Sequence, residues 1–134
     1  HLPERDGLLN CLLLAEVMGQ EGRTLAELVS DLQKEFGEHH FGRRDMHIPD
    51  EVKIPALQRA AAGVKTMGRF KVLESQELDG YKFILDAPVN GNGATPWILM
   101  RGSGTEPLLR VYAEAATPEL VEEILVAGEK FVNG

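Results

Sequence analysis

The stretch WILMRGSGTEPLLRVY, Trp97–Tyr112, decides the fold of the second half of this chain. Two runs of apolar residues, Pro96–Met100 and Leu108–Ala115, flank a polar loop, Arg101–Pro107. β-Branched and aromatic residues favour strands, and a short glycine-containing loop between two such runs favours a hairpin. The stretch therefore predicts two neighbouring antiparallel strands with a polar loop between them.

The loop has the composition of an anion-binding site. Arg101 offers a planar fork of donors, and Ser103 and Thr105 offer hydroxyl groups. Gly102 and Gly104 allow backbone N–H groups to come close to an anion and tolerate positive φ. The alternative is a plain connection between strands, because short motifs also arise by chance.

Upstream of these strands, residues 40–48 form a predicted strand and residues 51–62 a helix that Gly63 ends. Pro55 fits a helix only in its first turn, so the start of this helix is left open. Downstream, Thr117 and the following proline predict the start of a last helix over residues 118–132.

Two turns interrupt the middle of the chain. Asp79-Gly80 lies between the predicted strands Phe70–Leu78 and Tyr81–Asp86, and this dipeptide favours a two-residue hairpin turn of type I′. Asn90–Gly93 predicts a second turn. Trp97, at the start of its strand, is expected in the core.

From residue 38 onward the predicted order is strand, helix, four strands, helix. This order indicates an α+β fold in which an antiparallel sheet carries its helices on one face. Residues 38–134 are therefore predicted to form one domain.

Residues 1–37 read differently, as a helical hairpin. Asp6 is a predicted cap for a helix from about Gly7 to Met18, and Thr24 with Glu27 forms a capping box for a second helix that ends at Phe36-Gly37. The first helix is apolar nearly all round, which predicts self-association through residues 8–18.

Composition limits the classes of partner. The 134 residues carry a net charge of −7, whereas binding to a nucleic-acid backbone needs clustered lysine and arginine. Leu8–Met18 is too short to span a bilayer. A single cysteine, Cys11, fits a reducing compartment. We therefore expect a cytoplasmic protein without a nucleic-acid or membrane partner.

No metal site is predicted in this chain. His39 and His40 are adjacent, and adjacent side chains on a strand point to opposite faces. No cysteine accompanies them to complete a ligand set. Arg43-Arg44-Asp45 is interpreted as a charge cluster at a sheet edge rather than as a second anion site.

Several segments resemble the C-terminal end of the α-D-phosphohexomutases, the phosphoglucomutase and phosphomannomutase family. The resemblance covers essentially the whole chain, and the loop motif is its most specific part. The matching segments are His1–Leu8 before a leucine-rich helix, Phe41–Asp45, Asp79-Gly80 before Lys82-Phe83, and Arg101–Pro107 leading into Leu109–Tyr112.

The resemblance implies that residues 1–37 are a helical remnant of the third domain of a four-domain enzyme. Residues 38–134 would then be the fourth domain, with a fold like that of the TATA-binding protein. In this family the corresponding loop holds the substrate phosphate that is not transferred. The implied phosphate contacts are Arg101, Gly102, Ser103, Gly104 and Thr105, with Glu106 turned away to orient Arg101 or Arg110.

The resemblance also implies an activity for the parent enzyme. It would interconvert glucose 1-phosphate and glucose 6-phosphate through a phosphoserine and a bisphosphate intermediate, with Mg²⁺. The serine, metal and sugar loops of the family do not occur here, so no catalytic residue or metal ligand is predicted and the chain alone is expected to be inactive. The chain opens without a methionine and looks cut from a longer protein.

Two further readings stay open. The segment Pro3–Gly7 resembles the glucose branch of the family more than the glucosamine branch, with phosphomannomutase as the next alternative. A reading from another class is a non-catalytic regulatory module, whose loop binds a phosphorylated effector.

Overall fold

The computed structural model describes residues 6–89 and 95–134. It separates into two compact units, His1–Phe36 and Gly37–Gly134. The segment His1–Arg5 and the predicted turn Asn90–Gly93 lie outside the described residues.

The first unit consists of two helices, α1 (Gly7–Glu21) and α2 (Leu25–Phe36). Asp6 caps α1, because its Oδ1 atom accepts a hydrogen bond from the Leu9 N–H at 3.0 Å. The helix runs three residues beyond the predicted end at Met18 and stops at Gly22, whose φ of 62° is left-handed. Glycine adopts this conformation without steric cost, which makes it a common helix terminator.

The predicted capping box of α2 is present. The Thr24 N–H and hydroxyl donate to Glu27 Oε2 at 2.8 and 2.7 Å, and the Glu27 N–H donates back to Thr24 Oγ1 at 3.3 Å. The pKa of the Glu27 carboxyl is lowered from its usual value. The hydrogen bond from the Thr24 backbone is the largest cause, and the one from the Thr24 hydroxyl is the next. An ion pair between Arg23 and Asp31 (2.6 Å) adds a second local contact.

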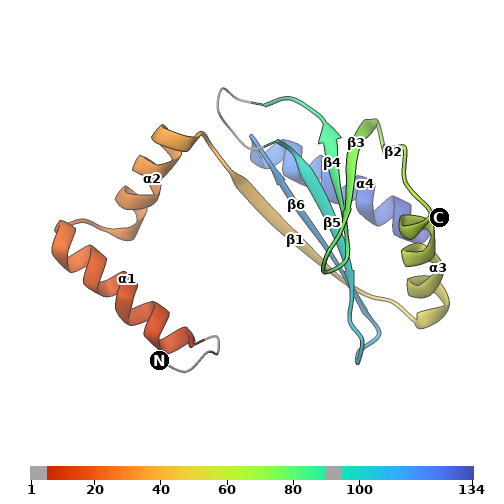
Figure 1. Ribbon diagram of the computed structural model, residues 1–134, viewed down its shortest axis with the longest axis horizontal. Helices are drawn as coiled ribbons and strands as arrows, with labels where there is room; N and C mark the ends of the chain where they lie inside the picture. Colours follow the sequence, from red (N-terminus) through yellow and green to blue (C-terminus); the bar gives the residue numbers. More distant parts are fainter. Residues whose placement is uncertain (1–5, 90–94) are drawn as a thin grey trace. The chain divides into compact units, whose positions relative to one another are not determined.

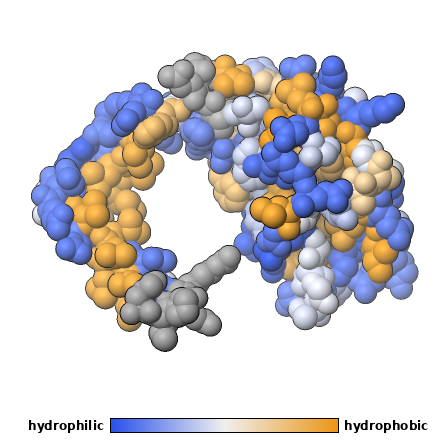
Figure 2. All heavy atoms as spheres, viewed as in Figure 1, coloured by the Kyte–Doolittle hydropathy of each residue, from blue (hydrophilic) through white to orange (hydrophobic). Residues whose placement is uncertain are grey.

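The apolar side chains of this unit remain exposed. Among residues 6–36, none in α1 or α2 is buried. Figure 2 shows a hydrophobic stripe along both helices, and its exposed members include Leu8, Leu12 and Val17 in α1 and Val29 and Phe36 in α2. The predictions that this hairpin belongs to a preceding domain and that it self-associates remain predictions.

The second unit is a six-stranded antiparallel sheet with the strand order β1-β6-β5-β4-β3-β2 (Figure 1). Two helices accompany the sheet, α3 (Asp50–Ala61) between β1 and β2, and α4 (Pro118–Asn133) after β6. The strands are β1 (His40–His47), β2 (Thr66–Met67), β3 (Phe70–Glu77), β4 (Tyr81–Asp86), β5 (Trp97–Gly102) and β6 (Leu108–Ala115).

Alternation along the strands builds a single core. Every second residue of β4, β5 and β6 faces α3 and α4, as Phe83, Ile98 and Val111 show with at most 1% exposure. The helix α4 lies so close to the sheet that a Cβ atom on Gly128 would come within 2.6 Å of Ile98 Cδ1. The prediction of an α+β fold with an antiparallel sheet is confirmed. The short strand β2 was missed, because two residues show no periodicity.

The turn between β3 and β4 differs from the predicted type. Glu77 pairs with Tyr81, so three residues form the loop rather than two. Only Gly80 has a positive φ, 122°, whereas a type I′ turn needs positive φ at both central residues. A Cβ atom on Gly80 would also lie 2.5 Å from the Met100 carbonyl oxygen, so the close approach of β5 requires glycine here.

Two other expectations change. Pro55 lies in the second turn of α3 rather than the first, and the helix begins upstream of it because the N–H groups of Val52 and Lys53 bond to the Pro49 carbonyl. Trp97 is half-buried on the face of the sheet opposite the core, where its ring lies 4.5 Å from the Lys82 ammonium. Its strand alternation assigns the core position to Ile98 instead.

Candidate functional site

Three segments meet at one end of the sheet around the loop between β5 and β6 (Figure 1). The turn between β3 and β4 approaches from one side, where Arg101 Nε lies 3.3 Å from Asp79 Oδ1. The connection from β1 to α3 approaches from the other, where the Ile48 N–H donates to the Pro107 carbonyl at 3.1 Å. The antiparallel register therefore places the predicted anion-binding residues at a junction of distant parts of the chain.

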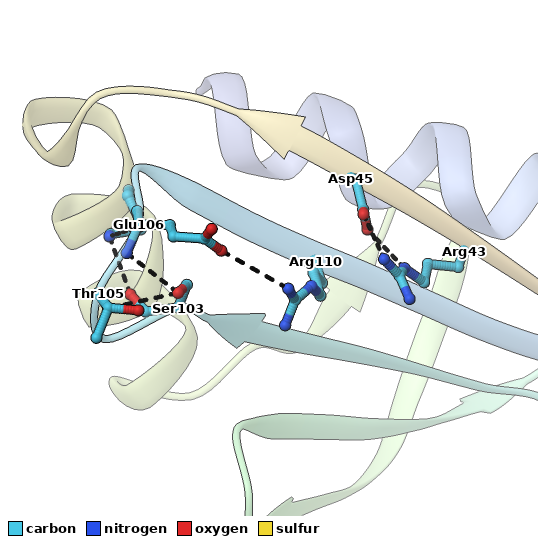
Figure 3. Close-up of polar contacts among 7 residues, drawn as sticks. Arg43, Asp45, Ser103, Thr105, Glu106 and Arg110 are labelled. Carbon is cyan, nitrogen blue, oxygen red and sulfur yellow. Dashed lines mark hydrogen bonds and ion pairs between the residues drawn. The ribbon is translucent and has the colours of Figure 1, made fainter. Parts of the chain in front are cut away.

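Within the loop, Ser103 organises the backbone (Figure 3). Its Oγ atom accepts the N–H groups of Thr105 at 3.4 Å and Glu106 at 3.2 Å, and its own N–H donates to the Leu108 carbonyl at 2.8 Å. Because the Ser103 oxygen acts as an acceptor in these bonds, its hydroxyl hydrogen can still be donated to another acceptor. The exposed Thr105 presents a second hydroxyl.

The two loop glycines serve different purposes, and neither has positive φ. A Cβ atom on Gly102 would lie 2.8 Å from Leu57 Cδ1, so this glycine lets α3 pack against the end of β5. A Cβ atom on Gly104 would meet nothing within 4 Å. The open surroundings of Gly104 leave its backbone accessible to a ligand.

Three cations near the loop each lie beside a carboxylate. Their pairs are Arg101–Asp79 (3.3 Å), Arg110–Glu106 (3.9 Å) and Lys53–Asp50 (2.8 Å). The first two involve exposed or half-exposed side chains, and ion pairs of that kind contribute little net stability. An arriving phosphate could therefore replace Asp79 beside Arg101 at low cost.

Glu106 points along the sheet toward Arg110, away from the loop tip (Figure 3). Arg110 in turn lies between Arg101 on β5 and Asp45 on β1, its partners in the strand register. Glu106 Oε2 lies 3.9 Å from Arg110 Nη2, and the orienting role expected of Glu106 toward Arg101 or Arg110 stays a prediction. The assignment of Arg101, Gly102, Ser103, Gly104 and Thr105 as phosphate contacts stays a prediction.

A second charged pair flanks Arg110 on the open face of the sheet. Arg43 donates from Nε to Asp45 Oδ1 at 2.6 Å and from Nη2 to Asp45 Oδ2 (Figure 3). This hydrogen bonding, and then the charges of Arg43, Arg110 and His47, hold the pKa of Asp45 below its usual value. Arg43 and Asp45 thus satisfy one another, as a charge cluster at a sheet edge would.

Sequence reasoning missed Lys53, which lies in the fourth position of α3. Its ammonium donates to the carbonyl oxygens of Ser103 at 3.1 Å and Glu106 at 3.0 Å. No sequence signal announces these contacts, because the partners are 50 and 53 residues away. Asp79 was identified as a turn residue, but its contact with Arg101 was not anticipated.

Among residues 6–89 and 95–134, no group of three or more His, Cys, Asp or Glu side chains could hold a metal ion. None of the helices in those two ranges combines the length and the apolar character that crossing a membrane requires.

The chain matches the family described as "Phosphoglucomutase/phosphomannomutase, C-terminal domain" over residues 51–128. A phosphoglucosamine mutase of Limosilactobacillus reuteri is 35% identical over 92% of this chain and 22% of its own length. A phosphoglucomutase/phosphomannomutase of Thermococcus kodakarensis is 27% identical over 96% of this chain and 25% of its own length. A phosphopentomutase of that organism is 33% identical over 72% of this chain and 20% of its own length. The chain thus spans about a fifth to a quarter of the length of these relatives.

Proposed function

This chain belongs to the phosphoglucomutase/phosphomannomutase family, and we propose that its loop binds the phosphate group of a phosphosugar that the full-length enzyme does not transfer. One observation carries the proposal. Arg101, the Ser103 and Thr105 hydroxyls and the accessible backbone of Gly104 occur together in one loop at the end of the sheet. A guanidinium, hydroxyls and backbone N–H groups are the donors that phosphate sites use.

The loop would contribute positioning rather than bond-making. A phosphate held at a fixed point orients the rest of the sugar, and such orientation lowers the barrier of a reaction that occurs elsewhere on the molecule. We propose that the full-length protein interconverts the 1- and 6-phosphates of a hexose, through a phosphoserine and a bisphosphate intermediate. The described residues do not fit a metal site, so the Mg²⁺ expected for the parent enzyme is assigned no ligand here and carries no step.

Two sugars are proposed as substrates. Glucosamine phosphate comes first, because several relatives that are 32–35% identical to this chain are named phosphoglucosamine mutases. Glucose phosphate comes second, because the segment Pro3–Gly7 resembles the glucose branch of the family and a relative named phosphoglucomutase/phosphomannomutase also aligns with 96% of the chain. Mannose phosphate is the third sugar to test.

The test uses the full-length protein and the 1-phosphates of glucosamine, glucose and mannose as substrates. Phosphorus NMR monitors the conversion of each 1-phosphate to the 6-phosphate. We expect Arg101→Ala to lower kcat/KM about 10- to 100-fold, since a hydrogen bond to a charged group contributes roughly 1.5–3 kcal/mol. The matched control is Arg69→Ala, which removes another exposed arginine that pairs with a carboxylate, Glu123. An unchanged kcat/KM in Arg101→Ala would refute the phosphate-binding role.

The same experiment separates the enzyme from a regulatory module. A module would bind hexose phosphates through the loop, with loss of binding in Arg101→Ala, but the full-length protein would convert none of the three sugars. Conversion of any of them excludes the regulatory alternative.

A further inference from the structure

The residue behind the loop is a buried lysine. Among the residues that the structure describes, Lys53 is the one charged side chain that is buried, with 8% of the residue exposed. Its stem lies beside Gly102, where an added Cβ atom would be 3.8 Å from Lys53 Cδ and 2.8 Å from Leu57 Cδ1. The absence of a side chain at Gly102 therefore allows α3 to bring Lys53 underneath the loop.

The Lys53 ammonium has three oxygen partners, two through hydrogen bonds and one through an ion pair. They are the carbonyl oxygens of Ser103 (3.1 Å) and Glu106 (3.0 Å) and the Asp50 carboxylate (2.8 Å). An ammonium has three donors and no acceptor. Two of the three donors of Lys53 thus bind loop carbonyls, and its charge is paired with Asp50, so we ascribe its contribution to support of the loop.

Lys53 donates to the carbonyl groups of Ser103 and Glu106. In the sequence these two residues flank Gly104 and Thr105, which form the tip of the loop. The peptide unit is planar and trans, so its C=O and N–H point in opposite directions. A Ser103 carbonyl fixed on Lys53 therefore directs the Gly104 N–H away from α3, and none of the described residues accepts that N–H. A carbonyl oxygen bound to an ammonium is also kept from facing, and repelling, an anion at the loop.

We propose that Lys53 is a positioning residue for the phosphate loop: its ammonium fixes the carbonyls of Ser103 and Glu106, and so holds the Gly104 N–H and the Ser103 hydroxyl ready for the phosphate. This inference rests on the proposed function of the loop. A small cleft, lined by Lys53, Asp50 and residues 104–107, separates the helix from the loop tip. The loop is therefore fixed at its base by Lys53 while its tip stays accessible.

The test compares Lys53→Met with Lys53→Arg in the full-length protein. Methionine keeps an unbranched stem of similar length and removes the charge and donors, while arginine keeps both. The matched control is Lys65→Met, the same change at an exposed lysine. Steady-state kinetics with glucosamine 1-phosphate and glucose 1-phosphate give KM and kcat, and hydrogen exchange by mass spectrometry gives the protection of a peptide covering residues 101–108.

Lys53→Met should raise KM about 10-fold or more with a smaller change in kcat, because binding of a phosphate that does not react is lost. Exchange in residues 101–108 should accelerate while β4 and α4 keep their protection. Lys53→Arg should recover most of the KM, and Lys65→Met should match the unaltered protein. A role confined to global stability would instead accelerate exchange throughout the sheet and leave KM unchanged in the folded fraction.

Unchanged KM in a folded Lys53→Met protein, or a raised KM with unchanged loop exchange, would overturn the positioning role. If this variant does not fold, Lys53→Gln, which keeps two N–H donors without the charge, undergoes the same test with intermediate values expected. Arg101→Ala distinguishes the two proposals. If that variant keeps its KM, phosphate binding by the loop fails, and the exchange data alone decide whether Lys53 holds the loop.

Discussion

The hairpin of α1 and α2 and the sheet unit of residues 37–134 are both rich in apolar side chains, yet they bury them very differently. Leu85 in β4 is 1% exposed, whereas Leu13 in α1 is 49% exposed and Leu8 is 73% exposed. The sheet unit therefore derives stability from its own apolar core. The hairpin relies on local contacts, such as the Thr24–Glu27 capping box and the Asp6 cap, which each contribute only about 1 kcal/mol.

The largest expected difference is in hydrogen exchange of the 134-residue chain. Amides of β5 and β6 should open only with global unfolding, which costs roughly 5–15 kcal/mol. Amides of α1 should open by local fraying, at a cost near zero to a few kcal/mol. Exchange measured residue by residue by NMR tests this contrast.

Self-association of the hairpin would reduce the expected difference in hydrogen exchange between α1 and the sheet. If residues 8–18 bind a second copy, protection of α1 should rise with protein concentration, and sedimentation should show a dimer that dissociates on dilution. Strong protection of α1 that does not depend on concentration would contradict both the contrast and the predicted self-association.

A pair of identical substitutions sharpens the comparison at the level of single side chains. Leu85→Ala should cost about 2–5 kcal/mol of unfolding free energy, because it leaves a cavity in the core. Leu13→Ala should stay within about 0.5 kcal/mol, as for other exposed sites. Urea unfolding followed by Trp97 fluorescence for the first variant and by far-UV circular dichroism for the second gives both values. Equal losses would show that α1 is buried in solution.

A smaller effect is expected in α2. Thr24→Ala removes the cap and should cost about 1 kcal/mol of helix stability, seen as lower helicity of residues 25–36 in NMR chemical shifts. The unfolding transition reported by Trp97 should not move, since Thr24 contacts its own helix. Ser30→Ala, an exposed hydroxyl in the helix interior, is the control and should not lower helicity.

The smallest effect concerns pH. The Arg43 hydrogen bonds lower the pKa of Asp45 in the folded protein, so their contribution to stability is complete above the ordinary pKa of 3.8 and is lost as pH falls through the folded value. In Asp45→Asn, the free energy of unfolding should therefore fall slightly less steeply with decreasing pH below pH 4, as measured by urea unfolding at a series of pH values.

How far the sequence predicts this molecule depends on the range of the contacts involved. The Thr24–Glu27 box, the Thr117 cap and the strands around Arg101–Pro107 were predictable, because neighbouring residues determine them. The turn at Asp79-Gly80 was placed correctly but given the wrong type. The loop also includes Leu78, and this follows from the pairing of Glu77 in β3 with Tyr81 in β4, which the dipeptide does not determine.

The candidate site shows the same division. The donors of the loop could be read from the sequence because they are adjacent. The support of the loop could not, since Lys53 and Asp79 reach it from other elements. Gly102 illustrates the difference in one residue: its presence was noted, but the reason for it, the approach of Leu57, required the packing of α3.

The pairing of β1 with β6 has a consequence for how the molecule folds. The first and last strands of the sheet meet along their whole length, and contacts between distant parts of a chain cost loop-closure entropy before they return stabilisation. The β3–β4 and β5–β6 hairpins can form early, whereas the Ile48–Pro107 and Lys53–Ser103 bonds wait for β1 and α3. We expect refolding chains to acquire sheet structure before they acquire ligand affinity, so that binding competence is among the last properties to appear.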